Sequence, residues 1–343
     1  MKTCGIKERK KAVKRMIIPK YLKEGDTIGI TAPSAGSGHD IPKLEYCLEK
    51  IRKEGYNVKE TPNVRSNRLV SSGAKKRAAQ LNDLVCDPDV DFILCAGGGD
   101  FLMEMLPHTD FDAFREHPKW LEGMSDPSTL LYIVPTKCDV ATMYGINAGF
   151  FNVARNPKSL NANLAFWKGN LVPQKSYKKC QRDITADKFR PSYPDPVYWE
   201  TPNGPVKTEG RMIGGCIDAL RDIVGTPYDY TKDFVNRYKD DGIIWFFDVF
   251  AQSSEDFYHT LFQMKECGWF KYTKGVILGR VLFPRTSTTV TYTKALRKIF
   301  GRKMPLITEA DIGHTSPAMV LINGGYAKIK AKDGKGSIVF TGE

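Results

Sequence analysis

The stretch "VDFILCAGGGD", residues 90–100, decides the fold. It is an apolar run, typical of a buried strand, that ends in three consecutive glycines. A second such run, "DTIGITAPSAG" at 26–36, also ends in a loop of small residues, and "KWLEGM" at 119–124 predicts a third, shorter strand. Because the carboxyl ends of parallel strands meet at one edge of a sheet, the loops that follow these strands are expected to gather around a ligand site.

Segments with helical spacing lie between the predicted strands. Apolar residues recur every three or four positions in 41–56, which Gly55 closes, and again in 73–87. The alternation of strands and helices predicts a parallel sheet covered by helices.

Composition places the chain among globular proteins. Of its 343 residues, 41% are hydrophobic and 26% are charged. No apolar run approaches the roughly 20 residues that span a bilayer, and the first residues lack the apolar centre of a secretory signal. We therefore expect a cytoplasmic protein that has no membrane partner.

Positive charge is concentrated at the start of the chain. Residues 1–20 carry a net charge of +7 out of +12 for the whole sequence, without interleaved aromatic residues. A run of this kind is typical of a solvated basic arm, and a nucleic-acid-binding face would need aromatic residues among the charges. We therefore expect no nucleic-acid partner.

The eight cysteines lie far apart and form no CxxC pair. Structural metal sites and dense disulfide frameworks both favour closer spacing, so reduced cysteines are expected. The glycine run lacks GxGxxG spacing, which disfavours a dinucleotide site. The prediction is no metal and no cofactor.

A change of composition divides the chain. Residues 169–207 are polar, basic and rich in proline, as linkers and surface loops are. The predicted organisation is the basic arm 1–20, an N-terminal α/β domain 21–168, a linker 169–207 and a C-terminal domain 208–343. In the last, "DGIIWFFDVF", "TKGVILGRVLF" and "PLITEADIGH" predict strands, and one helix begins at a Ser253–Asp256 capping box.

"LEGMSDPSTLL" at 121–131 poses the main functional question. Asp126 followed by Pro127 resembles a helix N-cap with proline at the first helical position. Ser125, at the sharp join of strand and helix, is alternatively a nucleophile. The stretch alone leaves both interpretations open.

Two distant residues supply a candidate base and acid. His314 directly follows a strand and a glycine, and Asp248 ends five apolar residues of another strand. A carboxylate there is costly to bury unless it is paired, and it could orient a histidine. It could equally cap the sheet or pair with a lysine. The backbone of the glycine run could supply oxyanion donors, or form only a tight turn.

Six segments in order then resemble one family. They are "GDTIGITAPS", "FILCAGGGDFLMEMLPHTDFDAF", "HPKWLEGMSDPSTLL", "EGRMIGGCIDALRDIVGTPYDY", "GIIWFFDVF" with "GVILGRV", and "DIGHTSPAMVLINGG". In order and approximate spacing they look like the LD-carboxypeptidase family of serine peptidases, which includes microcin C immunity peptidases. The likeness extends from about Gly25 to Gly325.

The resemblance implies a fold and a site. The fold would be a flavodoxin- or amidotransferase-like parallel-sheet domain with a smaller C-terminal α/β domain and the active site at their interface. The family's triad of serine, glutamate and histidine would fall on Ser125, Asp248 and His314. The oxyanion donors would be the backbone N–H of Asp126 and of Gly98 or Gly99.

Four positions depart from the family pattern. Asp248 is one methylene shorter than the expected glutamate, and Gly97 stands where many members have arginine. Cys216 replaces an asparagine, and Asp100 replaces a tyrosine. The last three changes bear on substrate identity more than on fold.

The resulting hypothesis is a serine-type carboxypeptidase or amide hydrolase that needs no cofactor. Because members of the family tend to form homodimers, we also expect a homodimer. By resemblance, its substrate would be the L,D-bond of muropeptides in cell-wall recycling or an aminoacyl nucleotide of the microcin C type. Trp199 could stack on a nucleobase, although packing is the simpler role for a lone aromatic residue. The alternative is a catalytically impaired family member that binds a ligand.

Overall fold

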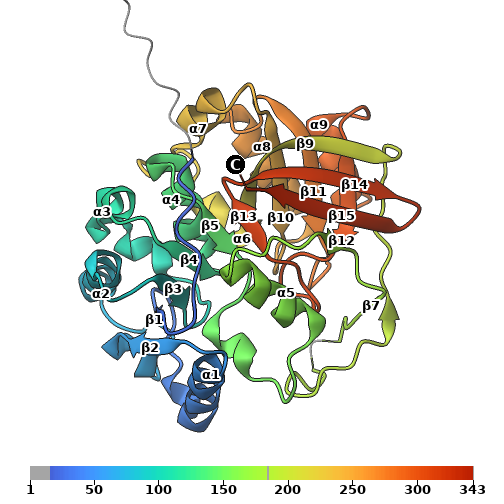
Figure 1. Cartoon of the computed structure of the whole chain (residues 1–343). Helices are drawn as coiled ribbons and strands as arrows, with labels where there is room; N and C mark the ends of the chain where they lie inside the picture. Colours follow the sequence, from blue (N-terminus) through green and yellow to red (C-terminus); the bar gives the residue numbers. More distant parts are fainter. Residues whose placement is uncertain (1–15, 184, 343) are drawn as a thin grey trace, which may run out of the picture.

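The computed structural model describes residues 16–183 and 185–342. Most of the predicted basic arm therefore lies outside the described residues. Two sheets lie side by side, the first formed mainly by the N-terminal half and the second by the C-terminal half (Figure 1). This arrangement confirms the predicted two-part α/β fold.

The first sheet has six strands in the order β13-β5-β4-β3-β1-β2. Five of them are parallel, and β13 joins the edge antiparallel to β5. Its strands are β1 (Thr27–Thr31), β2 (Asn57–Glu60), β3 (Phe92–Cys95), β4 (Trp120–Gly123), β5 (Thr142–Tyr144) and β13 (Leu321–Asn323).

Helices join these strands as the apolar spacing predicts. The helices of this half are α1 (Ile41–Lys53), α2 (Ala74–Cys86), α3 (Phe111–Glu116), α4 (Ser128–Cys138) and α5 (Lys158–Trp167), with 3₁₀ turns at Gly38–Asp40, Pro62–Arg65, Leu102–His108 and Ala148–Phe151. Leu44, Leu48 and Ile51 of α1 are buried, one helical turn apart. Burial of this apolar stripe against the sheet is what fixes the helix.

The second sheet has seven strands in the order β12-β11-β10-β9-β14-β15-β6. The strands β9 to β12 are parallel, and the other three are antiparallel. Its strands are β6 (Gln174–Lys175), β9 (Val206–Cys216), β10 (Ile243–Asp248), β11 (Thr273–Gly279), β12 (Leu306–Ala310), β14 (Tyr326–Lys332) and β15 (Lys335–Thr341).

Shorter elements complete this half. They are α6 (Ile217–Leu220), a 3₁₀ turn (Arg221–Ile223), α7 (Thr231–Arg237), α8 (Ser254–Glu266), α9 (Tyr292–Phe300), and the two-stranded pair β7 (Lys179–Cys180) and β8 (Asp195–Pro196). The α8 cap follows the sequence prediction, because the Ser253 side chain accepts the Asp256 N–H at 3.1 Å. Within the part of the chain that the structure describes, no helix has the length and apolarity to cross a membrane.

The stretch 169–207, predicted to be a linker, holds short strands. Of these, β6 joins the second sheet, and Trp199 is buried with its indole N–H donating to Asp311 at 2.8 Å. Trp199 therefore has the packing role, and its ring is closed to a nucleobase.

Polar contacts connect the two sheets. Asn323 of β13 accepts the Gly214 N–H of β9 at 2.9 Å and donates to the Leu131 carbonyl of α4 at 3.2 Å. The Ser128 hydroxyl, at the start of α4, accepts the Cys216 N–H at 3.0 Å. The carboxyl ends of β4 and β9 are thereby held against each other.

Candidate active site

Ser125 lies at a strained turn between β4 and α4. Its φ is 68°, in the left-handed region that non-glycine residues rarely adopt. The Ser128 N–H closes the turn by donating to the Ser125 carbonyl at 2.8 Å. A serine held in this conformation at a strand-to-helix turn presents its hydroxyl above the sheet edge, as nucleophilic serines of this type do.

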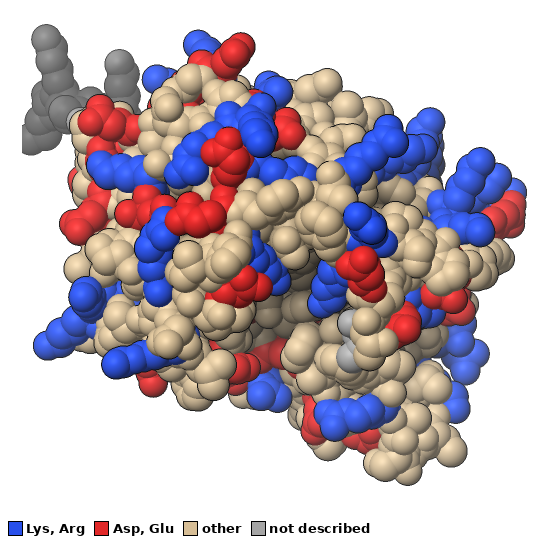
Figure 2. Space-filling model, turned by 90° about the horizontal axis from the view of Figure 1, so that it is seen from below, with Lys and Arg blue, Asp and Glu red and all other residues tan. Residues whose placement is uncertain are grey.

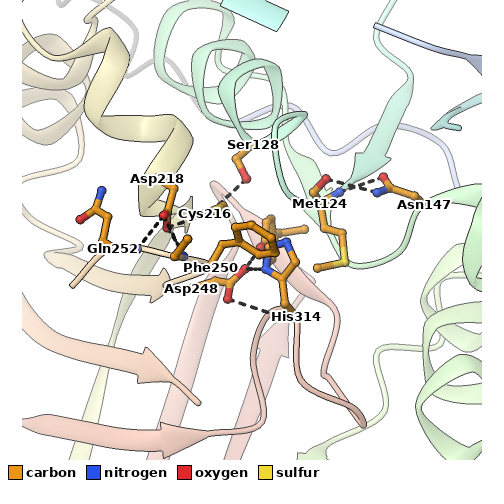
Figure 3. Close-up of polar contacts among 11 residues, drawn as sticks. Met124, Ser128, Asn147, Cys216, Asp218, Asp248, Phe250, Gln252 and His314 are labelled. Carbon is orange, nitrogen blue, oxygen red and sulfur yellow. Dashed lines mark hydrogen bonds and ion pairs between the residues drawn. The ribbon is translucent and has the colours of Figure 1, made fainter. Parts of the chain in front are cut away.

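Asn147 fixes the residue before the turn. Its side-chain carbonyl accepts the Met124 N–H at 3.0 Å, and its amide donates to the Met124 carbonyl at 3.3 Å (Figure 3). Asn147 is buried beyond the end of β5. Sequence reasoning missed it, since nothing in the sequence marks an asparagine that bonds to a backbone 23 residues away.

The glycine run lies directly against this turn. A Cβ built on Gly98 would lie 2.9 Å from the Ser125 Cβ and 3.0 Å from its Oγ, so only glycine leaves room there. Gly99 has a φ of 150°, and a Cβ on it would overlap the Ser34 hydroxyl. Within residues 16–183 and 185–342, no recorded hydrogen bond is donated by the backbone N–H of Gly98, Gly99 or Asp126.

The predicted helix cap by Asp126 is wrong. The N-cap residue of α4 is Pro127, and no side chain of the described residues caps the helix. The buried Asp126 carboxylate instead accepts hydrogen bonds from the Ser34 hydroxyl and, at 2.9 Å, from the Leu102 N–H. Asp126 therefore ties the Ser125 turn to the loops after β1 and β3. Burial raises the pKa of this carboxyl, although both hydrogen bonds oppose the shift.

Asp248 and His314 form a close pair at the carboxyl edge of the second sheet. The His314 Nδ1 lies 2.6 Å from the Asp248 Oδ2, and the His314 backbone N–H donates to Oδ1 at 3.3 Å (Figure 3). Asp248 is fully buried at the end of β10, and His314 follows β12 in the loop 311–316. A Cβ on Gly313 would overlap the Asp248 carboxylate, so this glycine, with a φ of 91°, admits the close approach.

The second nitrogen of His314 is free to act. The buried Nε2 has no hydrogen-bond partner among the described residues. Burial lowers the pKa of His314, but the charge and hydrogen bond of Asp248 outweigh burial and leave the pKa above 6.5. The other four histidines, at positions 39, 108, 117 and 259, are exposed.

Tyr144, from the end of β5, links the two halves of the site. Its hydroxyl donates to the Asp248 Oδ2 at 2.6 Å. The backbone amide of Ser125 lowers the pKa of this phenol. Burial, with the Asp248 charge, raises the pKa of Tyr144 well above its ordinary value, so the phenol stays protonated. Tyr144 of the first sheet thus contacts Asp248 of the second sheet directly.

A second carboxylate shapes the loop beside His314. Asp218 of α6 accepts the N–H groups of Phe250, Ala251 and Gln252 at 2.9, 2.9 and 3.0 Å. This holds the Phe250 ring against the His314 ring, with centroids 4.8 Å apart (Figure 3). Neither residue was found from the sequence, because Asp218 acts on a backbone more than 30 residues away.

Cys216 occupies the space beneath the pair. One potential ligand atom from each of Cys216, Asp248 and His314 lies within 4.8 Å of the others. By distance alone, these three described residues could hold a metal ion. Burial raises the pKa of the Cys216 thiol well above its ordinary value, and the neutral thiol is a poor metal ligand. The His314 Nδ1 is already engaged by Asp248, so the arrangement suits proton transfer better than coordination.

The chain has a two-domain α/β fold, and its candidate site lies where the two sheets meet. The family model of the LD-carboxypeptidase N-terminal domain matches residues 28–145, and that of the C-terminal domain matches residues 209–329. Together they span most of the sequence. The chain belongs to the LD-carboxypeptidase family and is a hydrolase of that family.

Relatives match over nearly the whole chain. A putative carboxypeptidase of Treponema pallidum is 26% identical over 90% of each chain. The microcin C7 self-immunity protein MccF of Escherichia coli is 25% identical over 88% of this chain and 89% of its own, and a probable murein peptide carboxypeptidase of Bacillus subtilis is 23% identical over 92% of each.

Solved structures share the fold. An MccF-like protein from Bacillus anthracis superposes with a TM-score of 0.81 at 22% identity, over 94% of this chain and 99% of its own. MccF in complex with glutamyl sulfamoyl guanosine gives a TM-score of 0.76 at 21% identity, over 94% and 98%.

Proposed function

We propose that this chain is a serine amide hydrolase whose catalytic residues are Ser125, His314 and Asp248. The single observation that carries the proposal is the Asp248–His314 pair, with Nδ1 held at 2.6 Å and Nε2 left without a partner. A histidine held in this way has one nitrogen fixed by an acid and the other available to a hydroxyl.

In the proposed reaction, Ser125 Oγ attacks the amide carbonyl while the His314 Nε2 takes its proton. Asp248 fixes the histidine tautomer and stabilises the imidazolium. The proton then passes to the leaving amine, and water repeats the sequence on the acyl-enzyme. The backbone N–H of Asp126 and of Gly98 or Gly99 would hold the oxyanion.

The substrate classes under this proposal are two. One relative is named a murein peptide carboxypeptidase, and another is an immunity protein solved with an aminoacyl sulfamoyl nucleoside. Both classes present an amide-type acyl bond to a nucleophile. We propose that the chain hydrolyses an L,D-peptide bond of a muropeptide or the acyl bond of an aminoacyl nucleotide.

The first experiment tests the nucleophile. Purified protein treated with a serine-directed fluorophosphonate should gain one adduct, and peptide mass spectrometry should place it on Ser125. Ser125→Ala should abolish labelling, whereas Ser37→Ala, on the loop near Gly97, should label normally. A folded protein that takes no adduct yet binds either substrate class would favour the alternative of a ligand-binding protein.

The second experiment separates the substrate classes. Muropeptide tetrapeptides and aminoacyl sulfamoyl adenosines are incubated with the protein and with Ser125→Ala, and products are followed by mass spectrometry. Release of terminal D-alanine identifies the first class, and release of the sulfamoyl nucleoside identifies the second. Turnover that survives Ser125→Ala would contradict the assigned nucleophile.

A further inference from the structure

A lysine-lined groove lies at the end of the second sheet opposite the candidate active site. Its volume is about 950 Å³, and it is lined by residues of β6, β9, β14, β15 and the loops beside them. The strand β9 runs from Val206 at the groove to Cys216 at the site. Ten steps from residue to residue along a strand span roughly 30 Å, so the groove is a separate surface.

Six lysines line this groove, and none of the described residues that line it is acidic. The lysines are Lys175, Lys178, Lys207, Lys330, Lys332 and Lys335, and all are exposed. Lys332 lies 3.8 Å from the exposed Asp333, and the other five have no ion-pair partner among the described residues. Basic side chains also gather along the right-hand margin of Figure 2, the side on which the second sheet lies in Figure 1.

The strand register brings like charges together. Lys207 lies directly opposite Lys330, and Lys332 lies directly opposite Lys335. Residues opposite one another have Cβ atoms about 5 Å apart, and like charges in such pairs destabilise a sheet. An arrangement that costs stability in the free protein becomes favourable when a polyanion neutralises it.

An exposed aromatic ring lies beside the same groove. Tyr198 is 62% exposed, and its ring covers Gly334, which lines the groove at the turn between β14 and β15. The adjoining lining includes the apolar Val197 and Ala331. A groove of positive charges with an exposed ring suits a flexible phosphate chain that carries flat bases.

The shape and chemistry select among polyanions. A concave groove favours a chain that enters it over a flat lipid surface. Lysines act as point charges without the fixed fork of arginine, so recognition would depend on phosphate charge and not on base sequence.

We propose that this groove binds single-stranded nucleic acid without sequence preference, through its phosphates on the lysines and one base on Tyr198. The proposal departs from the sequence expectation of no nucleic-acid partner, which considered only the basic arm. The groove lysines come from positions 175 to 335 and gather only in the folded sheet. The proposal is independent of the proposed hydrolase activity.

The test measures binding of a fluorescent oligothymidylate of about 12 nucleotides by anisotropy, from about 50 to 200 mM salt. The full chain should bind, with affinity falling as salt rises. Lys207→Gln/Lys330→Gln should weaken binding and reduce the slope of log affinity against log salt by about 0.7 per lysine removed. Tyr198→Ala should weaken binding about tenfold without changing that slope.

The matched control is Lys75→Gln/Lys76→Gln, which removes the same charge from exposed positions on α2. It should bind like the unmodified protein. Equal loss in both lysine pairs would mean that net charge, and not the groove, attracts the probe, and would overturn the proposal. A second outcome would also overturn the proposal. In it, the protein binds an oligoglutamate peptide or vesicles that contain anionic lipid, and does not bind the oligonucleotide.

Discussion

At the scale of single residues, Asp248 is one methylene shorter than the glutamate that the family resemblance implies at this position. In the structure, the loop 311–316 lies close to this carboxylate. Gly313 packs against the Asp248 carboxylate, and both the ring and the backbone N–H of His314 reach it. Aspartate and its glycine neighbour therefore act as a matched pair.

We expect Asp248→Glu to impair the enzyme, although glutamate is the residue that the family resemblance leads one to expect. The extra methylene has no room beside Gly313, so the histidine is displaced. A displacement of about 1 Å lowers kcat about a hundredfold. Steady-state kinetics on the substrate identified by mass spectrometry checks this, and unchanged or higher kcat would contradict the matched pair.

At the scale of elements, the loop after β3 and the Ser125 turn behave as one unit. Sequence reasoning predicted the strand, the glycine loop that follows it and the turn, because each of these has a signature in the local sequence. The contact between Gly98 and Ser125 could not be predicted, since it depends on how β3 and β4 pair.

Two alanine substitutions in this loop should differ sharply. In Gly98→Ala the new methyl would press on the Ser125 side chain, and kcat should fall about a hundredfold. In Gly97→Ala the nearest atom would be 4.0 Å away, so kcat should change little. Fluorophosphonate labelling rates of the two variants measure the effect directly, and equal rates would contradict the contact.

Behind the turn, β4 buries an acid that makes stability depend on pH. Burial raises the pKa of Glu122 from 4.5 to about 7, although hydrogen bonds from Trp167 and the Ile146 N–H oppose the shift. The folded state therefore binds this proton more tightly than the unfolded state does. The contribution of Glu122 protonation to the free energy of unfolding is greatest below pH 4.5 and is lost as the pH rises to about 7.

Glu122→Gln should remove that pH dependence. Relative to the variant, the unmodified chain should lose up to about 3 kcal/mol between pH 5 and pH 8. Urea unfolding at both values measures the difference, with Glu49→Gln, on the exposed surface of α1, as the control. If the unmodified protein and Glu122→Gln lose the same stability between pH 5 and pH 8, other groups cause the pH dependence and the prediction is wrong.

At the scale of the whole molecule, local patterns predicted most of the architecture. The parallel strands, the flanking helices and the family follow from motifs in chain order. Four side chains of the site could not be placed in this way, because the role of each depends on a contact between segments distant in sequence. They are Asp126, which does not cap α4, and Tyr144, Asn147 and Asp218. Asp248, His314 and Ser125 were nominated by position at strand ends, where parallel sheets place their ligands.

The junction of the two sheets should depend on Asn323. Its buried side chain bonds to β9 and to α4, so Asn323→Ala leaves the Gly214 N–H without this acceptor, while the Leu131 carbonyl keeps the hydrogen bond from the Thr142 hydroxyl at 2.6 Å. We expect a loss of about 1–3 kcal/mol in the free energy of unfolding. Asn57→Ala, at an exposed amide, should cost about 0.5 kcal/mol or less. Denaturant unfolding of both variants measures this, and equal small losses would contradict the role of Asn323.

The position of β13 also has a consequence for synthesis on the ribosome. The strand that completes the first sheet at β5 lies downstream of every other strand in that sheet and of His314. Until residues 321–323 emerge, the nascent chain presents the open edge of β5, and unpaired edges attract other chains. Chaperone demand during translation should therefore persist until late in elongation, and slowing the ribosome upstream of this segment should favour aggregation.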